Sequence, residues 1–151
     1  MRAIVLSLLL LGVALAAVAA PAPLPRRAKP QPSLFEGEWK MTRMDDRDET
    51  RLSLTVQIRG NRMKFVIDEG GGQSGELDAE FSVRPGPQPA PIDLRLLQRR
   101  RRGQTTPETE VVLGTYQIEG DVLRLSLGRK ARPTGIDDKA AERYVFTRVR
   151  R

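Results

Sequence analysis

Residues 52–67, LSLTVQIRGNRMKFVI, give the clearest indication of how this chain folds. The first half of this stretch alternates apolar and polar residues, which is the period of a β-strand that buries one face. Gly60 and Asn61 are typical of a tight hairpin turn, and the alternation resumes after them with Met63 and Phe65. The stretch therefore predicts two antiparallel strands that share one apolar face.

The same alternation recurs along the chain, between short clusters of Gly, Pro and charged residues. It predicts further strands near residues 37–43, 77–83, 92–96, 111–118, 122–127 and 142–149. About eight short strands joined mostly by local turns form an antiparallel meander. The sequence therefore predicts an all-β fold, either a closed barrel or a strongly curved sheet.

The N-terminal residues have the features of a secretory signal peptide. Arg2 precedes an apolar run, and small residues follow that run as far as Ala20. Cleavage after Ala19 would leave a Pro/Arg-rich linker at residues 20–32 and a folded domain at residues 33–151. The alternative is a retained membrane anchor, although the apolar run is shorter than the ~20 residues of a spanning helix. Cleavage predicts a periplasmic, cell-envelope or extracellular location.

Several short motifs suggest a family. They are FEGEW at residues 35–39, IDL at 92–94, LGTY at 113–116, EGDVL at 119–123 and the pair Arg132-Pro133. In their order and spacing they resemble a family of small lipocalin-like domains that is widespread in planctomycete bacteria and has no characterised function. The resemblance spans nearly the whole predicted domain. It implies a lipocalin-like barrel in an envelope or extracellular setting, and it implies no catalytic residue.

The interior of such a barrel is either filled with side chains or holds one small ligand. The sequence leaves both alternatives open, because its apolar residues are mostly Leu, Val and Ile, with few aromatic ones. Trp39 is expected to pack over the core at one end of the barrel, or else to stack on a ligand. If a cavity exists, we expect its lining to include Trp39, Leu54, Phe65, Tyr116, Leu125, Tyr144 and Phe146.

Four consecutive arginines are the most conspicuous charged feature of the chain. Adjacent guanidinium groups repel one another, so we expect residues 99–102 to form an exposed loop between two strands. Such a loop could contact a polyanion, either an acidic envelope polymer or anionic lipid. Nucleic acid is the less favoured polyanion, because no aromatic residue for base stacking lies near the run. The residues expected at this contact are Arg95, Arg99, Arg100, Arg101 and Arg102.

The composition argues against enzymatic chemistry. The chain has no Cys and no His, which removes the thiol nucleophile, the commonest general base and the commonest metal ligand. The acidic run DDRDE at residues 45–49 lacks the turn glycine of a calcium loop, so neither a metal site nor a cofactor is expected. The sequence therefore predicts an exported, non-enzymatic binding or structural module of the cell envelope. Its barrel would hold a small apolar ligand or contact a partner protein, and polyanion binding is the alternative.

Overall fold

The computed structural model describes residues 32–46, 52–71 and 73–150. These residues form antiparallel β-strands and one short helix, and the strands belong to one continuous sheet. Within them, no helix has the length and the apolar character needed to span a membrane. The predicted signal peptide at residues 1–19 and nearly all of the predicted linker lie outside the described residues.

The elements follow one another as a simple meander. In chain order they are α1 (Pro32–Phe35), β1 (Gly37–Met44), β2 (Ser53–Arg59), β3 (Arg62–Gly70), β4 (Gln73–Val83), β5 (Ala90–Arg101), β6 (Gln104–Pro107), β7 (Val111–Glu119), β8 (Val122–Gly128) and β9 (Glu142–Arg148). The stretch at residues 52–67 forms the β2–β3 hairpin, with Val56 paired to Phe65 across it.

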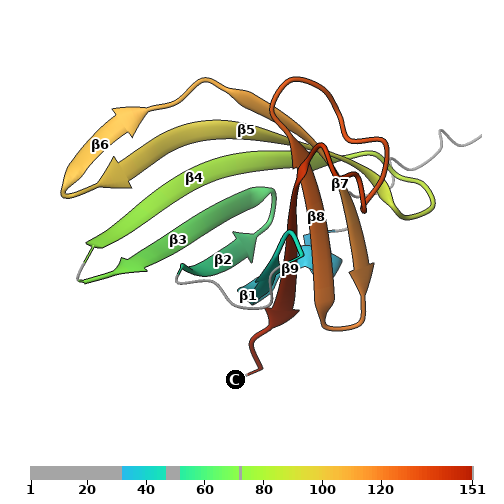
Figure 1. Ribbon diagram of the computed structural model, residues 1–151, viewed down its shortest axis with the longest axis horizontal. Coiled ribbons are helices and arrows are strands. Elements are labelled where there is room, and N and C mark those ends of the chain that lie inside the picture. The colour runs from blue at the N-terminus through green and yellow to red at the C-terminus, as the bar shows by residue number, and fades with distance from the viewer. Residues whose placement is uncertain (1–31, 47–51, 72, 151) are drawn as a thin grey trace, which may run out of the picture.

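The sheet closes on itself as a barrel (Figure 1). β1 to β5 pair in succession, β5 pairs with β7, β7 with β8 and β8 with β9, and β9 pairs back with β1. β6 stands outside this ring, since among the described strands it pairs with β5 alone. The prediction of an all-β, antiparallel, lipocalin-like barrel of eight strands is confirmed, and closure excludes the curved open sheet.

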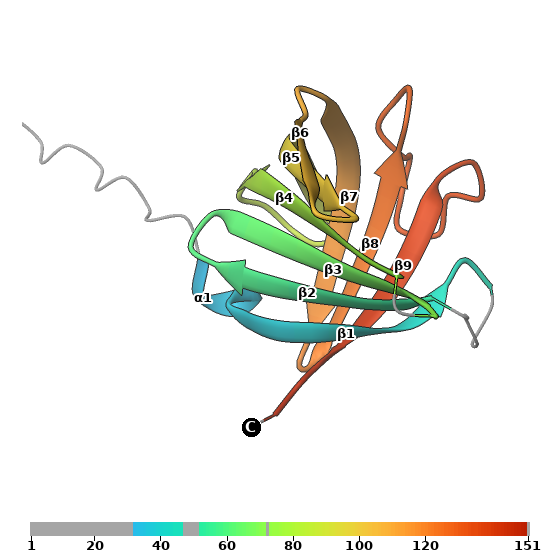
Figure 2. The ribbon, with the colours of Figure 1, turned by 90° about the vertical axis from the view of Figure 1, so that its left-hand side faces the viewer.

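Aromatic side chains close one end of the barrel. Trp39 is fully buried (0% exposed), and its indole Nε1 donates a 2.8 Å hydrogen bond to the carbonyl oxygen of Phe35. The ring centroid of Phe35 lies 5.0 Å from that of Phe81 and 4.9 Å from that of Tyr116. Phe35 ends α1, so this short helix plugs what we call the closed end (Figure 2).

Arg148, the last residue of β9, fastens α1 to the closed end. Its guanidinium carbon lies 4.1 Å from the centre of the Trp39 ring, which is a cation–π contact. It also donates hydrogen bonds to the backbone carbonyl oxygens of Leu34, at 2.8 Å, and of Glu36. Gly37 leaves room for this side chain, because its φ is +129° and a Cβ there would lie 3.0 Å from the Arg148 Nη1.

The connection between β8 and β9 is folded back onto the barrel wall. Arg132 donates from Nη1 to the carbonyl oxygens of Gly114, at 2.6 Å, and of Ile92, at 3.2 Å. Its Nη2 pairs with the carboxylate of Asp93. These bonds hold the β8–β9 connection against β5 and β7. They thereby fix the positions of Arg129 and Glu142 at its two ends, which belong to the candidate site described below.

Candidate functional site

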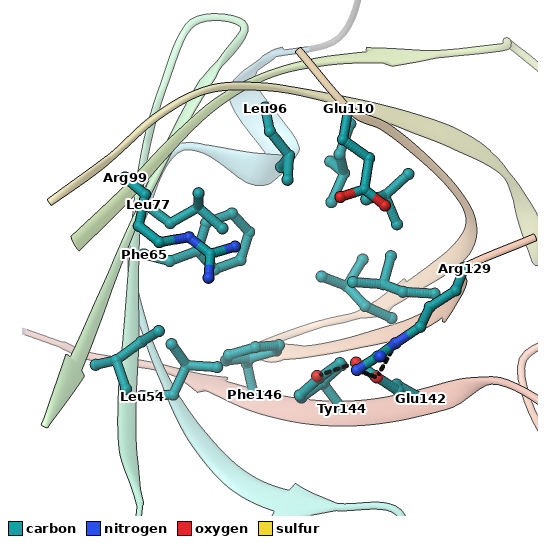
Figure 3. Close-up of a pocket in the computed structure, with 15 residues that line it drawn as sticks. Leu54, Phe65, Leu77, Leu96, Arg99, Glu110, Arg129, Glu142, Tyr144 and Phe146 are labelled. Atoms are coloured by element: carbon teal, nitrogen blue, oxygen red, sulfur yellow. Dashed lines mark hydrogen bonds and ion pairs between the residues drawn. The ribbon is translucent and has the colours of Figure 1, made fainter. Parts of the chain in front are cut away.

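The end of the barrel away from α1, which we call the open end, contains a cavity. Its volume is about 410 Å³. It is lined by Leu54, Phe65, Ile67, Leu77, Leu94, Leu96, Arg99, Glu110, Val112, Leu125, Leu127, Arg129, Glu142, Tyr144 and Phe146 (Figure 3). These residues come from seven of the eight barrel strands and their flanks, so the cavity occupies the barrel interior itself.

Most of this lining is apolar. Leucines predominate, joined by Ile67, Val112 and the rings of Phe65 and Phe146. Small-molecule sites in proteins have volumes of roughly 300–1,000 Å³, mainly apolar linings and a few placed polar groups. The open end has all three features. It can therefore enclose one small molecule whose larger part is apolar.

The cavity forms where β5 parts from β7. β5 pairs with β7 over residues 90–95, whereas its residues 98–101 pair with β6 instead. Between these two pairings, the Leu96 amide still donates to the Glu110 carbonyl oxygen, at 2.9 Å. The β5–β6 hairpin then runs on beside the tip of the β3–β4 hairpin (Figure 1). The barrel wall therefore widens at this end, and none of the described residues plugs it as α1 plugs the other.

A β-bulge in β5 turns Arg99 toward the cavity. In the pairing of β4 with β5 the register shifts, and Leu97 is left without a partner. Side chains alternate between the two faces of a strand, so an extra residue moves all those after it to the opposite face. Arg99, rather than Gln98, therefore follows Leu96 on the inner face. Figure 3 shows the guanidinium group of Arg99 pointing over the cavity.

Five polar side chains, which we call the rim, stand at the mouth: Arg99, Glu110, Arg129, Glu142 and Tyr144. Three of them form a self-contained group. Arg129 binds a carboxylate oxygen of Glu142 through Nη2 at 2.6 Å and Nε at 2.8 Å. The Tyr144 hydroxyl donates to the other oxygen at 2.8 Å. These contacts satisfy Glu142 within the protein.

Electrostatics supports this description of the group. The hydrogen bond and the charge of Glu142 hold the pKa of Arg129 above its usual value. The pKa of Tyr144 is raised well above that of a free tyrosine, first by burial and then by its hydrogen bond to Glu142. At neutral pH, Arg129 is therefore charged and Tyr144 is a neutral hydrogen-bond donor.

The other two rim residues keep hydrogen-bonding capacity. Arg99 pairs through Nε with Glu108 at 3.1 Å, which leaves its two terminal nitrogens for another partner. Glu110 extends its carboxylate toward the cavity, and within the described residues no ion pair involves it. Its charge still contributes to the raised pKa of Arg129. The mouth thus presents a donor group and an acceptor group to whatever enters.

The structure brings together five of the residues expected to line a cavity, namely Leu54, Phe65, Leu125, Tyr144 and Phe146. Trp39 and Tyr116 are not among the lining residues, so the prediction that they line the cavity is wrong. Both belong to the aromatic cluster around Phe35, which fills the closed end. The barrel is filled with side chains at its closed end and hollow at its open end, so each alternative is correct for one end.

Apart from Tyr144, the rim was not predicted as part of a cavity. Glu142 alternates with Tyr144 and Phe146 on the inner face of β9, so the period of that strand could have placed it as well. Glu110 and Arg129 lie just outside β7 and β8, where alternation gives no guidance. The inward direction of Arg99 depends on the bulge, for which the local sequence carries no signal.

The arginine-rich run does not form a loop. Residues 99–101 are the last residues of β5, and Arg102 lies in the turn to β6, with a φ of 52°. The predicted loop is therefore wrong, whereas the predicted exposure of residues 99–102 is confirmed, and the reason for the strand lies in its neighbour. On β4, Glu76 binds Arg100 at 3.2 Å and Glu80 binds Arg95, so carboxylates relieve the repulsion that was expected to expel the run from the sheet.

The described residues contain no group of three Cys, His, Asp or Glu side chains that could hold a metal ion. The acidic run at residues 45–49 lies partly outside the described residues.

Fold and cavity together define a class: a closed antiparallel barrel, filled at one end and hollow at the other. No protein-family model, no curated protein and no solved structure matches this chain. Its function therefore has to be inferred from the geometry of its cavity.

Proposed function

We propose that this chain is an exported, non-enzymatic binding protein of the cell envelope that holds one small, largely apolar molecule in the open end of its barrel. The supporting observation is the cavity of about 410 Å³, whose lining is mainly Leu, Ile, Val and Phe. Apolar surface in contact with water is unfavourable by about 25 cal/mol per Å². A ligand that covers this lining recovers that free energy.

The rest of the barrel supports such a role. The cavity is framed by paired strands, and the closed end below it is packed with aromatic rings. A preformed site of this kind does not need to be ordered on binding, which preserves affinity. Export is supported by the N-terminal sequence, and a non-enzymatic role by the absence of Cys and His.

The alternative, polyanion binding through Arg95 and residues 99–102, has weaker support. Arg95 pairs with Glu80, Arg99 with Glu108 and Arg100 with Glu76. A polyanion would have to displace these carboxylates or bind beside their negative charges. Both requirements reduce the gain expected from a run of arginines.

The neutral dye N-phenyl-1-naphthylamine tests the proposal, because its fluorescence increases when it leaves water. We expect saturable binding to the purified protein. Val112→Trp places a large side chain in the cavity and should abolish that binding. Val111→Trp is the matched control, since the adjacent Val111 is 52% exposed and does not line the cavity.

Circular dichroism and urea midpoints show whether both variants remain folded. If Val112→Trp does not fold, Leu77→Trp fills the same cavity from β4 and replaces it in the comparison. Non-saturable binding of the dye, or equal binding by the folded filled and control variants, would contradict the proposal.

A further inference from the structure

One cation of the rim is placed to receive a ligand group. Arg99 stands on the inner face of β5 because of the bulge, and Figure 3 shows its guanidinium group over the apolar lining. Glu108 occupies its Nε, at 3.1 Å, from outside the set of lining residues. The two terminal nitrogens are the edge of the guanidinium group that can bind two oxygens of one anion side by side.

The second cation of the rim does not have this capacity. Arg129 contacts Glu142 through two of its nitrogens, and Tyr144 donates to the same carboxylate. An anionic ligand group that approached Arg129 would meet the negative charge of Glu142. The asymmetry between the two arginines indicates the β5 side of the mouth as the place for an anion.

From this asymmetry we infer that the ligand of the cavity is an amphiphile with a single apolar body and one anionic head group. The terminal nitrogens of Arg99 bind the head group, and the apolar body lies against the lining toward Leu125 and Phe146. A carboxylate on an alkyl chain or an aromatic ring is the simplest compound of this class. This inference rests on the proposed function, since it names the chemical class of the ligand for the same cavity.

Glu110 offers a second test of the inference, because its negative charge repels an anion at the mouth. Two features outweigh it. The terminal nitrogens of Arg99 contact the anion directly, and the chain as a whole has a formal net charge of +7. Such a field raises the local concentration of anions. Removing the charge of Glu110 should therefore strengthen the binding of an anionic ligand, whereas removing that of Arg99 should weaken it.

Two dyes with the same ring system separate the head group from the body. N-phenyl-1-naphthylamine is neutral, and 8-anilinonaphthalene-1-sulfonate is the same molecule with one sulfonate added. In the purified protein, Arg99→Gln should weaken sulfonate dye binding by about five- to tenfold, a moderate effect because the site is partly exposed. Binding of the neutral dye should change by less than about twofold.

The chain offers a matched control for each effect. Arg100→Gln removes the same charge one residue away, on the outer face, where Arg100 pairs with Glu76. It should change binding of either dye by less than about twofold. Glu110→Gln should strengthen binding of the sulfonate dye by about two- to threefold. Added salt should reduce the binding of the sulfonate dye and leave that of the neutral dye unchanged.

Competition extends the test from dyes to simple amphiphiles. Decanoate should displace the sulfonate dye at a lower concentration than 1-decanol, and Arg99→Gln should remove that difference. If the neutral dye binds saturably but Arg99→Gln and Arg100→Gln affect the sulfonate dye equally, the assignment of the anion to Arg99 is overturned while the proposed function stands. If neither dye binds in the cavity, the proposed function itself fails.

Discussion

The two ends of the barrel are built from the same strands but differ in how far side chains fill the interior. At the closed end, Phe35, Trp39, Phe81 and Tyr116 fill the space, and Trp39 is 0% exposed. At the open end, leucines predominate in the lining of a cavity of about 410 Å³, and charged residues stand around its mouth. One sheet therefore provides both a packed core and a cavity, according to which side chains face inward and whether a plug covers the end.

Because of this difference, we expect the closed end to contribute most to stability and the open end to be available for binding. Burial and aromatic contacts stabilise the closed end, where a missing atom leaves a void that the neighbours cannot refill. The open end already borders a void, so its residues contribute less to stability and are available to a ligand. Matched substitutions at the two ends test this expectation.

The largest difference is expected for two leucines of β8. Leu123 is 0% exposed at the closed end, whereas Leu127 faces the cavity and is only partly buried. Leu123→Ala should reduce the free energy of unfolding by roughly 2–5 kcal/mol, and Leu127→Ala by about 1 kcal/mol, because little new cavity is made. Urea unfolding of both variants measures the difference. Equal midpoints would mean that the two ends are packed alike.

Much of this fold was accessible from the sequence, because each strand carries its own signal. Alternation along residues 52–67 and 122–127 gives strands with one inward face, and the Gly60-Asn61 turn joins the first pair. Local turns between successive strands then favour a meander. Closure is a global property, since it requires β9 to meet β1, and no local pattern in the sequence specifies that pairing.

The candidate site was less accessible, for physical reasons that differ between residues. Leu54 and Phe146 could be assigned to the lining because they alternate in regular strands. The place of Trp39 depends on α1, whose four residues carry no helical periodicity. The direction of Arg99 depends on a shift of register between β4 and β5, which is set by pairing partners far apart in sequence. Site residues of this kind follow from tertiary structure alone.

A smaller difference is expected between two arginines at the C-terminal end of the described chain. Arg148 stacks on Trp39 and binds carbonyl oxygens beside α1, whereas Arg150 is exposed and pairs with Asp121. Arg148→Gln should lower the free energy of unfolding by about 1–2 kcal/mol, and Arg150→Gln by less than about 0.5 kcal/mol. Chemical denaturation tests both. A loss for Arg150→Gln as large as that for Arg148→Gln would show that general charge, rather than the plug, stabilises this end.

The smallest effect concerns the two tyrosines, one at each end. Burial alone raises the pKa of Tyr116, whereas burial and the hydrogen bond to Glu142 together raise that of Tyr144. At neutral pH, Tyr144→Phe should lower the free energy of unfolding by about 0.5–1 kcal/mol, and Tyr116→Phe by less than about 0.5 kcal/mol. Equal losses at neutral pH would contradict the specific bond at the rim.

At alkaline pH, the stability of the parent protein should fall more steeply with pH than the stability of either tyrosine variant. Below about pH 10, tyrosine is protonated in both the folded and the unfolded chain, so neither residue makes stability depend on pH. Above that pH the unfolded chain loses these protons first, because the folded chain holds both pKa values higher. The stability of the parent protein should therefore fall as the pH rises further, and each Phe variant should show a shallower fall. Unfolding curves at several alkaline pH values measure the slopes. An unchanged slope in Tyr144→Phe would mean that solvent reaches the rim hydroxyl freely, and that the open end is wetter than its apolar lining indicates.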